Sequence, residues 1–156
     1  MFGRGDWSFA PPELLWGLGV RATGSFRHVD LYLLGSLLCE LTTGQAATAM
    51  LIPDWLAVRQ HAERLPLDAR ITAHHAQIAA LRPRLASIAG LVRDSAPSHL
   101  GTGLAELFGQ LCDPEPSVRG RRTRNERNLP LTNLAWLLHR VDILRKHQLA
   151  RFDFSS

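Results

Sequence analysis

The sequence predicts an all-α protein. Apolar residues recur at the three- and four-residue spacing of amphipathic helices in several segments, and the strict alternation typical of strands is nearly absent. With 46% hydrophobic and 21% charged residues, the composition is that of a folded globular chain. A chain of 156 residues is long enough to bury one core. We therefore expect a single helical domain over 1–156.

The strongest helical segment is 30–43. Asp30 is placed to cap its first turn, and Gly44 to end it. Leucines cover nearly the whole circumference between them, at Leu31, Leu33, Leu34, Leu37, Leu38 and Leu41. A helix that is apolar all round is expected to be buried on every side, so we predict that this is the central helix. Gly35 and Ser36 are small enough for another backbone to approach it closely.

The other helices are predicted from their caps and apolar stripes. Their ranges are 11–15, 53–64, 68–81, 84–92, 102–112 and 132–148. Ile71, Ile78, Leu81, Leu85 and Ile88 mark the inward side of the long central pair. We expect a kink or break at Pro83, because its ring removes a helical hydrogen bond. Gly101–Gly103 is interpreted as a loop at the start of the next helix.

No apolar run reaches the roughly 18 to 20 residues that cross a bilayer. The longest run, 31–41, already contains Glu40. No basic segment followed by an apolar stretch opens the chain, so we expect no secretory signal and a cytoplasmic location. Cys39 and Cys112 lie in apolar helical patterns and are predicted to be buried free thiols, with a disulfide or metal role as the alternative.

Three sequence motifs follow one another along the chain. The first is GDWSFAPPE at 5–13, the second runs from DLYLLG to ELTTG within 30–44, and the third is LCDPEPSVR at 111–119. They resemble the end of the activation segment, the buried F helix and the turn before the last helices of the protein kinases. The resemblance implies the helical half of a kinase C-terminal lobe. The segment 45–103 matches no motif of that family and is longer than the family usually allows there.

The resemblance implies structural roles for three residues. Glu13 is expected to pair with Arg119 and so to tie the activation segment to the lobe; the alternative is that both are unpaired surface residues. Asp30 is expected either to accept hydrogen bonds from the backbone of a catalytic loop or to act as a plain helix cap. Activation-segment positions fall on Gly5, Asp6, Phe9 and Pro12.

The residues that transfer phosphate in a kinase are missing from this sequence. A kinase needs a glycine-rich loop, a lysine on a strand, a catalytic aspartate and a metal-binding aspartate, and no motif for any of them is found. Asp6 stands where the family usually has a threonine, and its carboxylate would repel a catalytic aspartate. We therefore predict a catalytically silent, pseudokinase-like chain with no catalytic residue, no metal site and no cofactor.

One arginine-rich run, 119–127, stands out in a chain of net charge +4. Its interpretation is a solvated loop with Arg119 turned inward. The alternative is contact with an acidic protein or a nucleic acid, because clustered arginines attract phosphate. The candidate contact residues are Arg121, Arg122, Arg124 and Arg127. Aromatic residues do not interleave with them, and no sequence-specific recognition is expected.

Three functions follow as hypotheses. The first is a silent kinase-like lobe that acts as a protein-interaction or scaffold module, because a half-lobe leaves apolar surface uncovered. Its partner is either a chain that supplies the complementary kinase half or an unrelated protein. The second is the C-terminal fragment of an active serine/threonine kinase whose ATP-binding half lies upstream or on another chain. The third is a small arginine-rich helical protein that binds nucleic acid. No membrane partner is expected.

Overall fold

The computed structural model describes residues 6–19 and 26–120. Throughout these residues the regular structure is helical and no strand occurs, which confirms the predicted all-α class. Backbone contacts divide the chain into two compact units, Met1–Arg119 and Gly120–Ser156, and the elements below belong to the first. The single domain over 1–156 and the helix at 132–148 stay predictions, and the latter lies outside the described residues.

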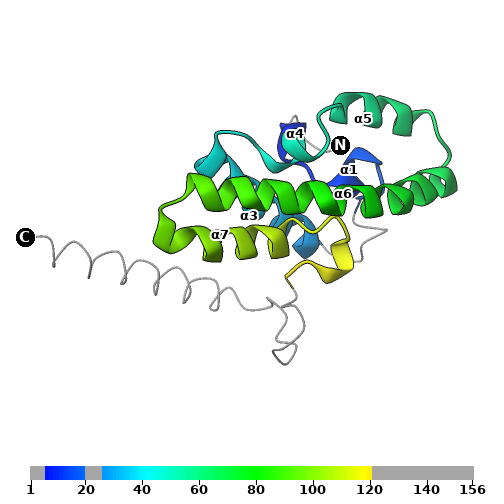
Figure 1. Cartoon of the computed structure of the whole chain (residues 1–156). Coiled ribbons are helices and arrows are strands. Elements are labelled where there is room, and N and C mark those ends of the chain that lie inside the picture. The colour runs from blue at the N-terminus through cyan, green and yellow to red at the C-terminus, as the bar shows by residue number, and fades with distance from the viewer. Residues whose placement is uncertain (1–5, 20–25, 121–156) are drawn as a thin grey trace, which may run out of the picture. The chain divides into compact units, whose positions relative to one another are not determined.

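The described elements are joined by short connections from residue 26 onward (Figure 1). In chain order they are the 3-10 helix η1 (Trp7–Phe9), the α-helices α1 (Pro12–Leu15), α3 (Phe26–Thr43), α4 (Ala47–Leu51), α5 (Trp55–Glu63), α6 (Leu67–Ser95) and α7 (Ser98–Leu111), and the 3-10 helix η2 (Pro116–Val118). Helices α6 and α7 lie side by side, and α3 packs against both. No helix of the described segments is long and apolar enough to cross a membrane.

The core lies between α3, α4, α6 and α7. Most of the predicted inward stripe of α6 is buried, namely Ile78, Leu81, Leu85 and Ile88. Ile71 is only partly buried and packs on a smaller cluster formed by Trp16, Leu18 and Ala62. Leu107, Phe108 and Leu111 of α7 are buried as predicted, and Leu104 packs against the core. Cys39 and Cys112 are free and buried, also as predicted.

Of the kink or break that was predicted at Pro83, the break is wrong. Helix α6 runs without interruption from Leu67 to Ser95 and contains this proline. Pro83 and Ala79, whose carbonyl loses its helical partner, lie on the exposed side of α6, opposite the buried stripe. Since that side faces water, the unpaired carbonyl is not stranded in an apolar core. The position of the proline is known from the sequence, but the sequence pattern did not show that the unpaired carbonyl would face water.

Gly101–Gly103 is not a loop, and this prediction is also wrong. The three residues lie inside α7, which begins earlier than expected, at Ser98. A Cβ atom at Gly101 would lie 2.4 Å from the backbone oxygen of Arg93 in α6. Glycine is therefore required at this position for the close approach of α7 to α6.

Helix α3 is not buried on every side, which corrects the central prediction. Val29, Tyr32, Gly35, Ser36 and Cys39 form its buried side. The large apolar residues of the other side are exposed, namely Phe26, Leu33, Leu34, Leu37 and Leu41. The expected close approach at the small residues is confirmed, because a Cβ at Gly35 would lie 2.5 Å from the sulfur of Cys112. The expected end of the helix is confirmed too, with Gly44 at a φ of 79°.

Candidate functional site

A buried ion pair joins the two ends of the first unit. Glu13 lies in α1, and Arg119 follows η2. Arg119 donates from Nη1 to Oε1 of Glu13 at 2.5 Å and from Nη2 to Oε2 at 2.7 Å. The exposed fractions of the two side chains are 0% and 1%. The contact expected between these residues is therefore present, in the two-bond geometry that makes arginine–carboxylate pairs strong.

Two of the three remaining N–H groups of Arg119 are also used. Its Nε donates to the carbonyl of Asp113 at 2.7 Å, and Nη1 also donates to the carbonyl of His28 at 3.1 Å. The guanidinium carbon lies 4.8 Å from the centre of the Tyr32 ring. Four of its five N–H groups thus donate to protein acceptors, and this pairing offsets much of the cost of burying the charge. Arg119 thus fastens α1 and the start of α3 to the turn that follows α7.

A second polar network lies beside this pair and was missed in the sequence. Thr48 donates its hydroxyl to the carbonyl of Ala10 at 2.6 Å, and the hydroxyls of Tyr32 and Thr48 are 2.9 Å apart. The hydroxyl of Ser36 accepts from the backbone N–H of Ala47 at 3.0 Å. Burial raises the pKa of Tyr32, which keeps the phenol neutral. These bonds fix α3 to α4 and to the segment before α1.

His74 lies in α6 and is also buried. Its Nε2 atom has no hydrogen-bond partner among the residues that the structure describes. Burial lowers the pKa of this imidazole below its usual value of 6.5. Weaker electrostatic effects come from Glu13 and Glu115, which raise the pKa, and from His75 and Arg119, which lower it. The folded protein therefore holds His74 neutral.

This burial predicts a loss of stability in mild acid. Because the folded-state pKa is lowered, the unfolded chain takes up the proton first as the pH falls below about 6.5. The free energy of unfolding should then decrease, with a slope of at most about 1.4 kcal/mol per pH unit from this one group. Urea titrations between pH 7.5 and pH 5 measure it. His74→Leu should flatten the slope and His99→Ala, at an exposed position in α7, should not; an equal slope in wild type and His74→Leu would contradict the assignment.

The exposed side of α3 carries an apolar stripe, which we call the apolar face of α3. It consists of Phe26, Leu33, Leu34, Leu37 and Leu41. Their exposed fractions range from 37% for Leu34 to 78% for Leu41. The four leucines follow one another at spacings of three and four residues and so lie next to one another along one side of the helix, and Phe26 lies two turns before Leu33 on the same side. A contiguous patch of this kind is typical of a surface that binds another protein.

Asp30 lies within the same stripe. It is exposed and belongs to the second turn of α3, which begins at Phe26. The prediction that Asp30 caps this helix is therefore wrong, because the helix starts one turn earlier. Its expected contact with a catalytic loop stays a prediction. Glu40, also exposed, lies near the other end of the stripe.

The residues at activation-segment positions have local structural roles. Asp6 caps η1 by accepting the backbone N–H of Ser8 at 2.9 Å, and this hydrogen bond lowers the pKa of its carboxyl. Phe9 is half-buried at the end of η1, and Pro12 is buried as the first residue of α1. Gly5 lies outside the described residues.

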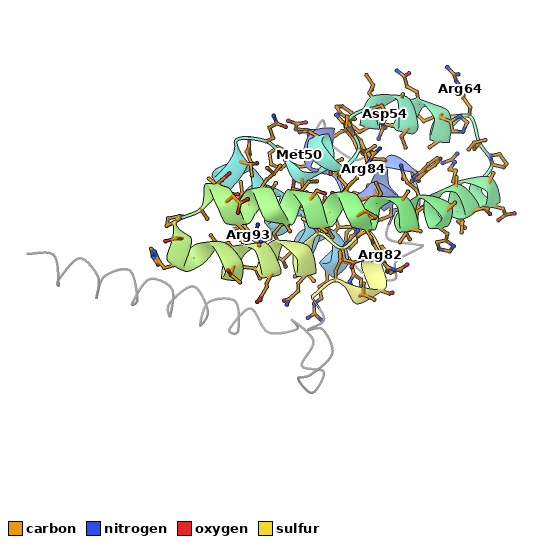
Figure 2. All side chains as sticks on the ribbon, viewed as in Figure 1. Met50, Asp54, Arg64, Arg82, Arg84 and Arg93 are labelled. Atoms are coloured by element: carbon orange, nitrogen blue, oxygen red, sulfur yellow. The ribbon has the colours of Figure 1, made fainter. Side chains whose placement is uncertain are left out.

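The arginines of the predicted 121–127 cluster, Arg121, Arg122, Arg124 and Arg127, also lie outside the described residues. Figure 2 places Arg82, Arg84 and Arg93 along α6. Arg84 donates to the carbonyl of Leu51 at 3.3 Å, and Arg93 bonds the neighbouring Asp94 at 2.9 Å. Within the part of the chain that the structure describes, no group of three or more His, Cys, Asp or Glu side chains is placed to hold a metal ion.

Comparisons with protein-family models, with curated proteins and with solved structures find no match to this chain. The kinase resemblance therefore stays a prediction that rests on three sequence motifs. The Glu13–Arg119 contact is a geometric feature that this resemblance anticipated. The all-α fold and the apolar face of α3 stand independently of any family assignment.

Proposed function

We propose that this chain is a helical protein-interaction module, organised like the helical half of a kinase C-terminal lobe and silent in phosphate transfer. It docks an amphipathic helix of another protein on the apolar face of α3. The observation that carries the proposal is that face, where five large apolar side chains of one helix are exposed together. Burying such side chains against a partner is the main favourable term in most protein association.

The other side of α3 supports this function because it holds the helix in place. Tyr32 is fixed through Thr48, and Cys39 lies in the core. Gly35 packs directly against the end of α7. A helix held so firmly presents its exposed side with little loss of conformational entropy on binding. The catalytic silence in this proposal rests on the missing phosphate-transfer motifs.

The fragment hypothesis assigns the same face to a different polypeptide segment. In that case an ATP-binding half encoded upstream, or carried on another chain, covers α3. Reading the DNA before the codon of Met1 separates an ATP-binding half encoded upstream from a partner on another chain. An in-frame His-Arg-Asp motif followed by Asp-Phe-Gly would favour a longer active kinase, and an in-frame stop codon would favour a separate partner.

Leu37→Ser and Leu41→Ser should change the free energy of unfolding by about 1 kcal/mol or less, because both side chains already face water. Leu38→Ser is the matched control in the same helix. Its side chain packs against the core, so it should destabilise clearly more. Urea unfolding followed by circular dichroism gives all three values. If Leu37→Ser were as destabilising as Leu38→Ser, the side chain would belong to the core and the face would not be free.

The docking itself is tested with a fluorescein-labelled synthetic helix that carries one leucine stripe on an otherwise glutamine- and alanine-based surface. We expect the full-length chain to bind this neutral helix weakly, as measured by fluorescence anisotropy. The double variant Leu37→Ser/Leu41→Ser should reduce the affinity about tenfold, because two contacts of the buried interface are lost. Equal affinities of wild type and the double variant would overturn the proposed function.

A further inference from the structure

We propose that Asp30 makes the apolar face of α3 selective for a basic helix, one that carries an arginine or lysine beside its leucines. This inference rests on the proposed docking function and names the chemistry of its partner. Asp30 lies one turn after Phe26 and one turn before Leu33 and Leu34. Its carboxylate therefore stands inside the stripe that a partner would cover.

Covering an isolated carboxylate with apolar groups is unfavourable. A helix docked on the face with only leucines would remove water from Asp30 and supply no compensating bond. An arginine or lysine at the facing position turns this penalty into a charge-assisted hydrogen bond. Asp30 thus disfavours partners with an uncharged or acidic residue there. Such a combination of one attractive and several unfavourable pairings is how interfaces gain specificity.

The charges around the stripe also favour a basic partner. Glu40 adds a second exposed carboxylate near Leu37 and Leu41. The only arginine of α3 is Arg27, which already takes part in an interaction within the chain. The two carboxylates outweigh the one arginine, so α3 carries a formal charge of −1 (one Arg against one Asp and one Glu), although the whole chain has a net charge of +4. The complementary partner is a helix with basic residues along its apolar stripe.

Pairing with α3 of a second copy does not satisfy Asp30. In a parallel pair of α3 helices in register, Asp30 would face Asp30 of the other copy, and like charges repel. In an antiparallel pair centred between Leu33 and Leu34, Asp30 would lie opposite Leu37. Neither arrangement offers a counter-charge to the carboxylate. The partner that we propose for this face is therefore a helix of a different polypeptide with a basic residue at that point, rather than α3 of a second copy.

The test uses three fluorescein-labelled helices that share one leucine stripe and differ at the position that faces Asp30. That position carries lysine, glutamine or glutamate. The full-length chain should bind the lysine helix about tenfold more tightly than the glutamate helix at low salt. Asp30→Lys should reverse the order, so that the glutamate helix binds best.

Asp68→Lys is the matched control, since it makes the same charge change at an exposed position in the first turn of α6. It should keep the wild-type order of the three helices. Equal affinities of wild type for the lysine and glutamate helices would overturn the selectivity while leaving docking intact. If Asp30→Lys and Asp68→Lys changed the affinities for the three helices by the same factors, the selectivity of Asp30 would also be overturned, because the changes would reflect net charge alone. If no helix binds, or if the glutamine helix is indifferent to Leu37→Ser/Leu41→Ser, the docking function itself fails.

Discussion

Replacing Arg119 by methionine should lower the free energy of unfolding by about 3–5 kcal/mol. The loss comes mainly from Glu13, whose carboxylate is fully buried and would be left without its counter-charge. The carbonyls of Asp113 and His28 would also lose a donor. Urea unfolding followed by far-UV circular dichroism measures the change. We expect the cooperative transition to remain, with its midpoint shifted to lower urea.

The double variant Glu13→Leu/Arg119→Met is the control for this result. It should recover much of the lost stability, because removing both charges leaves no ion stranded in the core. Arg119→Lys should not recover it, since lysine cannot make two parallel bonds to one carboxylate. An Arg119→Met variant within about 1 kcal/mol of wild type would contradict the structural role of the pair.

Gly101→Ala should destabilise the protein by about 1–3 kcal/mol. The new methyl group would lie 2.4 Å from the backbone oxygen of Arg93 and 3.2 Å from its Cγ. Backbone atoms cannot move aside as a flexible side chain can, so α7 would have to shift away from α6. The same urea titration, or the change in Tm, reports the effect.

Gly109→Ala provides the matched comparison in the same helix. Nothing described lies within 4 Å of the position that its Cβ would occupy. There the substitution should stabilise the fold by about 0.5–1 kcal/mol, because alanine loses less backbone entropy than glycine on folding. If both variants changed stability in the same direction and by similar amounts, the close approach at Gly101 would not be the cause.

A helix could be predicted from the sequence where residues at its own start or end determine the boundary. The expected helix at 53–64 corresponds to α5, Trp55–Glu63, because Pro53 and Asp54 mark its start in the sequence itself. The effect of Pro83 was not predictable in this way. Whether a proline breaks a helix depends on whether the proline lies on the side of the helix that faces water. For α6, the water-facing side is determined by its packing on α7 and α3.

The exposure of α3 is the most instructive difference. A helix that is buried on all sides has apolar residues around its whole circumference. A helix that packs on the core with one side and binds a partner with the other has the same apolar pattern. The distinguishing residues were present in the sequence. Small residues such as Gly35, Ser36 and Cys39 gather on the buried side, and Asp30 interrupts the leucines of the exposed side. A carboxylate within an apolar stripe indicates contact with water or with a cation.

The candidate site was predictable only in part. The Glu13–Arg119 pair followed from two motifs far apart in the chain. The groups that complete it, the carbonyl of His28 and the ring of Tyr32, belong to contacts that no local pattern encodes. The same holds for Thr48 and His74, whose burial depends on helices that meet only in the folded chain.

Backbone amide chemical shifts of the full-length chain test the docking on α3 most directly. In a titration with the lysine-bearing leucine helix, we predict the largest shift changes along α3, between residues 30 and 41. Amides of α5 and of the exposed side of α6 should change little. Changes centred on α5 or α6, or spread evenly over the chain, would contradict the account.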